Sequence, residues 1–252
     1  MTVTWLRYYL WIAPHALLVV VLVVMFRRKL QRQFPIFFTY IAFEIIQFLT
    51  LFIAEYSPSI SRKQYYLLFL FGSAISTILR FGVLYEIFIH VFRNYPALNR
   101  SARVSFRWAV LLLFVAATAF SFSKSGDQID RMLTVIFVFD RTFSIVQCGL
   151  LLSLFLFSRY FSISWKSHVF GIALGFGVFA SVELATSAIR SQIGVSGNQI
   201  LDFITMATYH LCVLIWLFYM LAREQTPKYN SSDLPEHDLE TWNQELHRLI
   251  KK

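Results

Sequence analysis

The sequence predicts an all-α integral membrane protein that crosses the bilayer seven times. Hydrophobic residues make up 57% of the chain and charged residues only 15%, whereas soluble domains are about half apolar and about a quarter charged. The apolar residues also form long blocks, which one soluble core could not absorb. The seven blocks long enough to span a bilayer are about 5–26, 34–54, 65–92, 106–122, 131–158, 168–190 and 199–222.

Each block has features that support a spanning helix. The first lacks the basic start and cleavage site of a signal peptide, so we expect it to stay in the membrane. Pro35 opens the second, at a position where a helix tolerates proline. The third and fifth are long enough to tilt, and the fourth, FRWAVLLLFVAATAFSF, is the shortest. In the sixth, Gly171 and Gly175 share a face and predict close contact with a neighbouring helix.

Basic residues between the blocks predict the orientation. Ten arginines and lysines fall in the loops after the first, third and fifth blocks, against six on the other side. The positive-inside rule therefore places the N-terminus outside and the C-terminus in the cytoplasm. We expect a multi-pass protein of the bacterial inner membrane. Because these residues lie between apolar blocks, the net charge of +9 does not indicate a nucleic-acid partner.

The last thirty residues differ from the rest of the chain. We expect residues 1–222 to form the seven-helix bundle and residues 223–252 a cytoplasmic tail. The tail begins with a polar linker, EQTPKYNSSDLPEHD, and continues with one apolar helical stripe formed by Leu239, Trp242, Leu246 and Leu249. This amphipathic helix would lie on the membrane lipids or bind a cytoplasmic partner.

Polar and ionisable residues recur inside the blocks at steps of three and four, which places each set on one helix face. Such residues are costly in a bilayer and usually face the bundle interior. We expect a polar cavity that opens outward and is closed below by apolar runs such as LLVVVLVVM. The candidate ligand-binding residues are His15, Glu44, Gln47, Arg80, Asp140, Arg141, Gln147, Glu183, Tyr209 and His210.

The chemistry of these residues predicts a small polar or anionic ligand, or a proton. The two arginines would hold an anionic group, the three carboxylates would act as counter-ions or acceptors, and the two histidines would respond to protons. The alternative for each residue is a structural role, in which buried ion pairs fix the register of the helices.

Signatures of catalysis and of cofactor binding do not occur in the sequence. There is no HExxH, no GxSxG and no glycine-rich phosphate loop, and the last block has no lysine for a retinal Schiff base. Cys148 and Cys212 lack metal-binding spacing, and only His90 with His168 could form a haem pair. We expect no cofactor and no metal, and nothing indicates an enzyme.

Two functions fit this pattern. The first is a membrane receptor or sensor with an outward-facing site. The second is a small-solute or proton-coupled transporter, built from two three-helix repeats as in the SWEET family. Transporters of this kind usually have broken helices near the midplane, and here Pro14 is the only proline well inside a block. A scaffold, an accessory subunit and an unrecognised membrane enzyme stay open.

Five segments resemble a group of uncharacterised bacterial seven-helix membrane proteins. They are RRKLQRQFPIFFTYIAFE at 27–44, LRFGVLYEIFIHVFR at 79–93, FRWAV at 106–110, QCGLLLSLFLFSRYF at 147–161 and SHVFGIALGFGVFASVELA at 167–185. This resemblance implies a fold and no activity. The topology also resembles the membrane sensor parts of some bacterial signalling proteins, which is an analogy of fold alone.

Overall fold

The computed structural model describes residues 2–58, 60–91, 104, 143–145, 147–149, 151–152, 167–193 and 198–222. These residues form helices and no strand. The elements are α1 (Thr2–Arg27), the 3-10 turn η1 (Leu30–Arg32), α2 (Pro35–Tyr56), α3 (Arg62–Val91), α6 (His168–Ile193) and α7 (Asn198–Leu221). Residues 143–145, 147–149 and 151–152 are also helical.

Five helices are long and apolar enough to cross a membrane, as in a multi-pass membrane protein. They confirm five of the seven predicted blocks, and α1 begins three residues earlier than predicted. The fourth block and most of the fifth lie outside the described residues. So do Asp140, Arg141 and the tail at 223–252.

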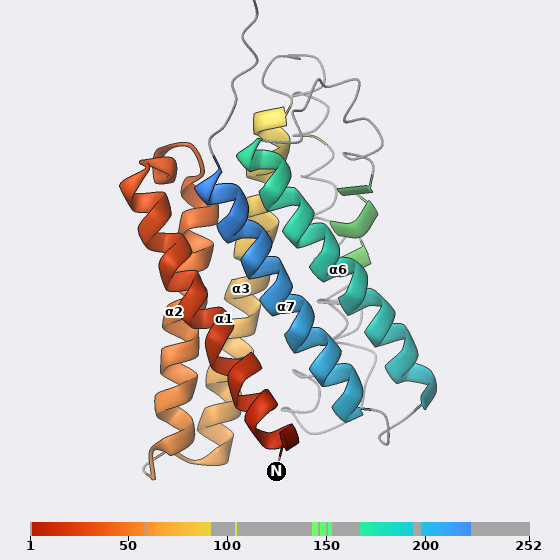
Figure 1. Ribbon diagram of the computed structural model, residues 1–252. Helices are drawn as coiled ribbons and strands as arrows, with labels where there is room; N and C mark the ends of the chain where they lie inside the picture. Colours follow the sequence, from red (N-terminus) through yellow and green to blue (C-terminus); the bar gives the residue numbers. More distant parts are fainter. Residues whose placement is uncertain are drawn as a thin grey trace, which may run out of the picture.

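The five helices form a closed ring (Figure 1). Helix α1 packs between α2 and α7, α3 packs on α2, α6 packs on α7, and contact between α3 and α6 closes the ring. Helices α1, α3 and α7 run in one direction, and α2 and α6 run in the other. We call the end where α1 begins the amino-terminal end, and the end where α1 finishes the Arg28 end.

The turn after α1 connects the first and last helices. Arg28 Nη1 donates hydrogen bonds to the carbonyl oxygens of Met220 (3.0 Å) and Ala222 (2.9 Å). A cation at the C-terminus of α7 is favourable, because the helix dipole is negative there. Lys29 completes the turn with a left-handed backbone (φ 60°), which few non-glycine residues adopt.

The buried core is concentrated in the half of the ring near the Arg28 end. Its centre is an aromatic cluster from three helices, made of Phe37 and Tyr40 on α2, Phe176 on α6 and Trp216 on α7. In five pairs formed by these rings the centroids lie between 4.9 and 6.2 Å apart. All four residues are at most 3% exposed. This cluster fills the middle of the ring, so the Arg28 half is closed by apolar contacts.

Helices α6 and α7 are in close contact at two glycines. A Cβ at Gly171 would overlap the ring of Tyr219, and one at Gly175 would overlap the indole of Trp216. The Trp216 Nε1 also donates to the Ile172 carbonyl at 3.3 Å. The predicted contact through these glycines is confirmed, and α7 is the partner helix.

The amino-terminal half contains fewer of the buried core residues. Trp5 is 79% exposed and Tyr8 is 50% exposed there. At this end an exposed ion pair at 2.9 Å joins Arg190 of α6 to Asp202 of α7. Between this end and the closed Arg28 half lie three buried polar residues of α3, Ser76, Thr77 and Arg80.

Candidate functional site

Helix α3 carries three polar side chains into the middle of the ring. Ser76 and Thr77 lie four and three residues before Arg80, so both are on the side of the helix that Arg80 occupies, and each of the three is at most 8% exposed. Burial of a guanidinium requires partners for its charge and its hydrogen-bond donors. The neighbouring helices provide these partners.

Arg80 is held by contacts on three sides. Its Nη2 donates to the Thr77 hydroxyl at 3.1 Å, and its Nη1 lies 3.6 Å from Glu183 Oε2. Its guanidinium carbon also lies 5.5 Å from the centre of the Phe143 ring, at the distance of a cation–π contact. These contacts fix the position of the positive charge between α3, α6 and residue 143.

Glu183 is shared between two donors. Its Oε2 accepts a hydrogen bond from the Ser144 hydroxyl at 2.8 Å and faces Arg80. Three residues later, Gln147 Nε2 donates to the Phe176 carbonyl of α6 at 3.0 Å. Ser144 and Gln147 are therefore connected to α6 by polar contacts at this depth.

Glu44 reaches α3 from the other side. The Ser76 hydroxyl donates to Glu44 Oε1, and Ser76 lies one turn before Arg80. Glu44 is within electrostatic range of Arg80, and Tyr209 on α7 is within range of both. We call the connected set the polar network, which consists of Glu44, Ser76, Thr77, Arg80, Ser144 and Glu183.

The two candidate histidines lie among aromatic side chains. His15 Nδ1 is 2.8 Å from the Trp11 carbonyl, so Nδ1 carries a proton and donates it. The His15 ring stacks on Phe48 with centroids 4.0 Å apart and lies 5.9 Å from the Tyr209 ring. His210 lies beside Tyr9 at 5.6 Å. Both rings therefore have local packing roles on α1 and α7.

Several buried polar atoms near this level have no hydrogen-bond partner among the described residues. They are Gln47 Oε1, Gln147 Oε1, the Tyr209 hydroxyl and His210 Nδ1. The Gln47 side chain packs against Gly72, where a Cβ would lie only 2.6 Å from its Nε2. Buried polar groups without partners are uncommon, and at a functional site they are candidates to contact a ligand.

The structure joins three charged residues of the predicted site, Glu44, Arg80 and Glu183, within one network. Arg80, predicted to hold an anionic ligand, is already paired with a carboxylate of the protein. Asp140 and Arg141 lie outside the described residues. Sequence reasoning missed Ser76 as the partner of Glu44, although its four-residue step from Arg80 is visible in the sequence.

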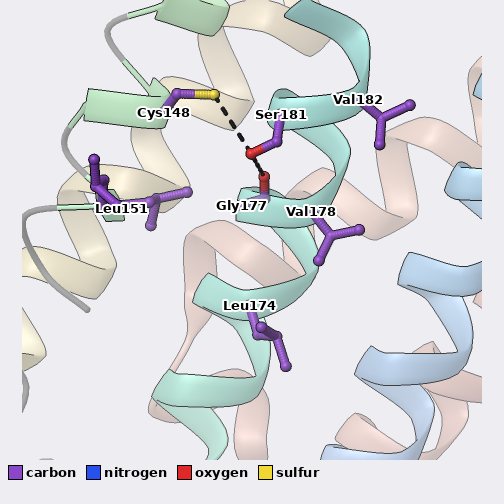
Figure 2. Close-up of a pocket in the computed structure, with 8 residues that line it drawn as sticks. Cys148, Leu151, Leu174, Gly177, Val178, Ser181 and Val182 are labelled. Carbon is purple, nitrogen blue, oxygen red and sulfur yellow. Dashed lines mark hydrogen bonds between the residues drawn. The ribbon is translucent and has the colours of Figure 1, made fainter. Parts of the chain in front are cut away.

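Two pockets lined by described residues lie elsewhere. One, of about 340 Å³, lies between α6 and residues 148, 151 and 152 (Figure 2). In it the Cys148 sulfur is 3.9 Å from the Ser181 hydroxyl, and the other lining residues are apolar or glycine. The second, of about 440 Å³, lies at the end of α2 beside Phe52 and Tyr56. Neither contains a candidate residue, so the outward cavity stays a prediction.

Metal coordination has no candidate in the part of the chain that the structure describes. No three histidine, cysteine, aspartate or glutamate residues of that part lie close enough together to hold an ion.

Comparison of the chain with family models, with curated proteins and with solved structures finds no match in any of the three. The resemblance to the bacterial seven-helix group therefore stays a prediction from the five segments.

Proposed function

We infer that the chain is a multi-pass membrane receptor or sensor, in which the polar network and the buried polar atoms near it respond to a small ligand or a proton. One observation carries this proposal. Glu44, Arg80 and Glu183, from three different helices, lie in one connected network at the level where the closed core begins. Charged groups at this depth are costly, and in membrane proteins they usually mark functional sites.

The asymmetry of the ring favours a receptor over a transporter. A transported solute must leave through the Arg28 half, where the aromatic cluster is buried and packed. A receptor needs access from one side only. Broken helices near the midplane are typical of many transporters. Each described helix instead continues as one α-helix through this level.

We also propose seven spans, with the N-terminus outside, in a bacterial inner membrane. Helix α3 ends and α6 begins at the Arg28 end, so the intervening chain returns to the side from which it left. The two further spans predicted from the sequence fit this requirement. The tail at 223–252 would then follow α7 into the cytoplasm, where its predicted amphipathic helix would contact lipids or a partner.

A ligand screen by thermal unfolding tests the receptor proposal. Wild type, Arg80→Ala and Arg190→Ala would be purified in detergent and screened against a panel of small carboxylates, phosphates and amines. Arg190 is a matched control, because it is an arginine ion-paired on the exposed end of α6. We expect a compound that raises the Tm of wild type and of Arg190→Ala, and raises that of Arg80→Ala much less. Equal stabilisation of all three proteins would remove the polar network as the site.

Liposome flux separates the transporter alternative from the receptor. Uptake of a solute or of protons by reconstituted wild type, abolished in Glu44→Gln and kept in Glu55→Gln, would identify a transporter. Glu55 lies on the same helix and is exposed, so it controls for the loss of a carboxylate. We expect no uptake.

A further inference from the structure

The charges of the polar network do not balance. Among the described residues, the only side chains at this depth that carry a formal charge are Glu44, Arg80 and Glu183. With all three ionised, the network has one more negative than positive charge. Asp140 and Arg141 lie outside the described residues and are not part of this sum. An uncompensated charge inside a membrane is strongly disfavoured.

The contacts show which of the two carboxylates, Glu44 or Glu183, has its negative charge less well compensated. Glu183 receives the Ser144 hydroxyl and faces Arg80 at 3.6 Å. Arg80 is oriented toward that side by Thr77 and by the ring of Phe143. Glu44 accepts from neutral hydroxyls only, those of Ser76 and Tyr40, and meets Arg80 only at longer range.

The other titratable groups around Glu44 do not supply the missing charge. Tyr40 lies one turn away on the same helix, and Tyr209 faces it from α7; both are neutral or negative. On α1, His15 stacks on Phe48, one turn beyond Glu44, and its Nδ1 proton is donated to the Trp11 carbonyl. Both of these contacts are made away from Glu44, and no described contact joins His15 to that carboxylate.

We propose that Glu44 binds a proton and is the protonated carboxyl group of this site, so that the proton is the ligand of the resting network. This inference rests on the proposed function and names its ligand. A metal cation suits the site less well, because a cation needs several oxygens around one point. Here the Ser76 oxygen directly contacts Glu44, and the guanidinium of Arg80 would repel a cation.

Infrared spectroscopy tests the proposal, because a protonated carboxyl group absorbs separately from a carboxylate. Spectra of the purified full-length protein would be recorded near neutral pH, in water and in heavy water. We expect a protonated-carboxyl band in wild type that shifts in heavy water. Glu44→Gln should lose the band, and Glu55→Gln should keep it.

A second variant tests the charge argument independently. Glu183→Gln removes the described carboxylate that competes for Arg80, so the charge of Arg80 acts more strongly on Glu44. The band should therefore disappear in this variant although Glu44 is still present. Absence of the band in wild type, or its persistence in either network variant, would overturn the proposal.

Failure of this inference is distinguishable from failure of the proposed function. A receptor whose Glu44 is ionised would show no band, yet would still show ligand stabilisation that depends on Arg80. Retention of the band in buffers with sodium or with potassium as the only cation is also expected. Loss of the band with one of these cations alone would show that the cation replaces the proton, which would overturn the assignment.

Discussion

At the scale of single residues, Arg80 supplies the positive charge in the middle of the ring. Its side chain is 9% exposed, and its charge faces a carboxylate that is 28% exposed. Desolvation of such a pair consumes much of its Coulomb energy, so the pair adds little net stability when intact. Removal of one partner is costly, because the other charge then stays partly buried without its counter-ion.

Arg80→Ala should therefore destabilise the protein far more than Arg190→Ala. We expect a loss of about 3 kcal/mol in the free energy of unfolding for Arg80→Ala, because Glu183 loses the cation that faces its carboxylate. The exposed Arg190–Asp202 pair should be worth about 0.5 kcal/mol. Unfolding by sodium dodecyl sulfate, followed by circular dichroism, measures both. Similar losses in the two variants would contradict the role given to Arg80.

Sequence reasoning located the charged members of the site and missed their connections. Glu44, Arg80 and Glu183 could be predicted because each interrupts an apolar block. The Ser76–Glu44 bond and the contact of Arg80 with Phe143 could not be, since they depend on the rotation of α3 relative to two neighbours. Helical periodicity defines a face but not what that face contacts.

At the scale of helices, the start of α2 shows how the free backbone amides of a helix end find a hydrogen-bond acceptor in an apolar environment. The first amides of a helix lack intrahelical partners. Pro35 has no N–H, and the next two amides, of Ile36 and Phe37, donate to the Glu86 carboxylate at 3.0 and 2.9 Å. Glu86 of α3 therefore caps α2. The sequence indicated Pro35 as the start, but a cap fifty residues away was not visible.

Glu86→Ala should loosen the start of α2. Removal of the carboxylate leaves two buried amides without their acceptor, and we expect a loss of about 2 kcal/mol. Hydrogen exchange measured by mass spectrometry should speed up in peptides that cover residues 34–41. Glu55→Ala, at the other end of α2, is the control and should leave that exchange unchanged. An unchanged rate in Glu86→Ala would show that the cap contributes nothing.

The α6–α7 contact gives a second prediction for helices. Gly175→Ala places a methyl group on the Trp216 indole, and Gly171→Ala places one on Tyr219. We expect each to cost about 1–3 kcal/mol, because the packed rings must move. Gly149→Ala meets nothing within 4 Å and should leave the Tm nearly unchanged. Thermal unfolding in detergent compares the three variants, and equal Tm values would exclude tight packing at the two glycines.

At the scale of the whole molecule, the ring has a closed apolar half at the Arg28 end and the polar network beside it. Spanning segments were predictable, because each needs only a long apolar run, and the five described helices match their blocks. The order of neighbours around the ring was not predictable in full. Contact between α3 and α6 joins segments 77 residues or more apart, from Val91 to His168, and depends on which helix faces are complementary.

The orientation and the number of spans can be tested with single cysteines. In a background with Cys148→Ser and Cys212→Ala, reporters would be placed at Lys63, in the first turn of α3, and at Arg32, in η1. Both positions are exposed, and they lie at opposite ends of the ring. An impermeant maleimide should label Lys63→Cys in intact cells and label Arg32→Cys only after permeabilisation, because the basic loops stay inside.

A third reporter, Lys124→Cys, separates seven spans from five. It lies between the fourth and fifth predicted spans. If both cross the membrane, Lys124→Cys is labelled from outside, like Lys63→Cys. If neither crosses, it is labelled only after permeabilisation, like Arg32→Cys, and the protein has five spans. Labelling of Arg32→Cys in intact cells would reverse the orientation. The amino-terminal half of the ring would then face the cytoplasm, and so would the adjacent side of the polar network. A receptor for an external ligand would be excluded.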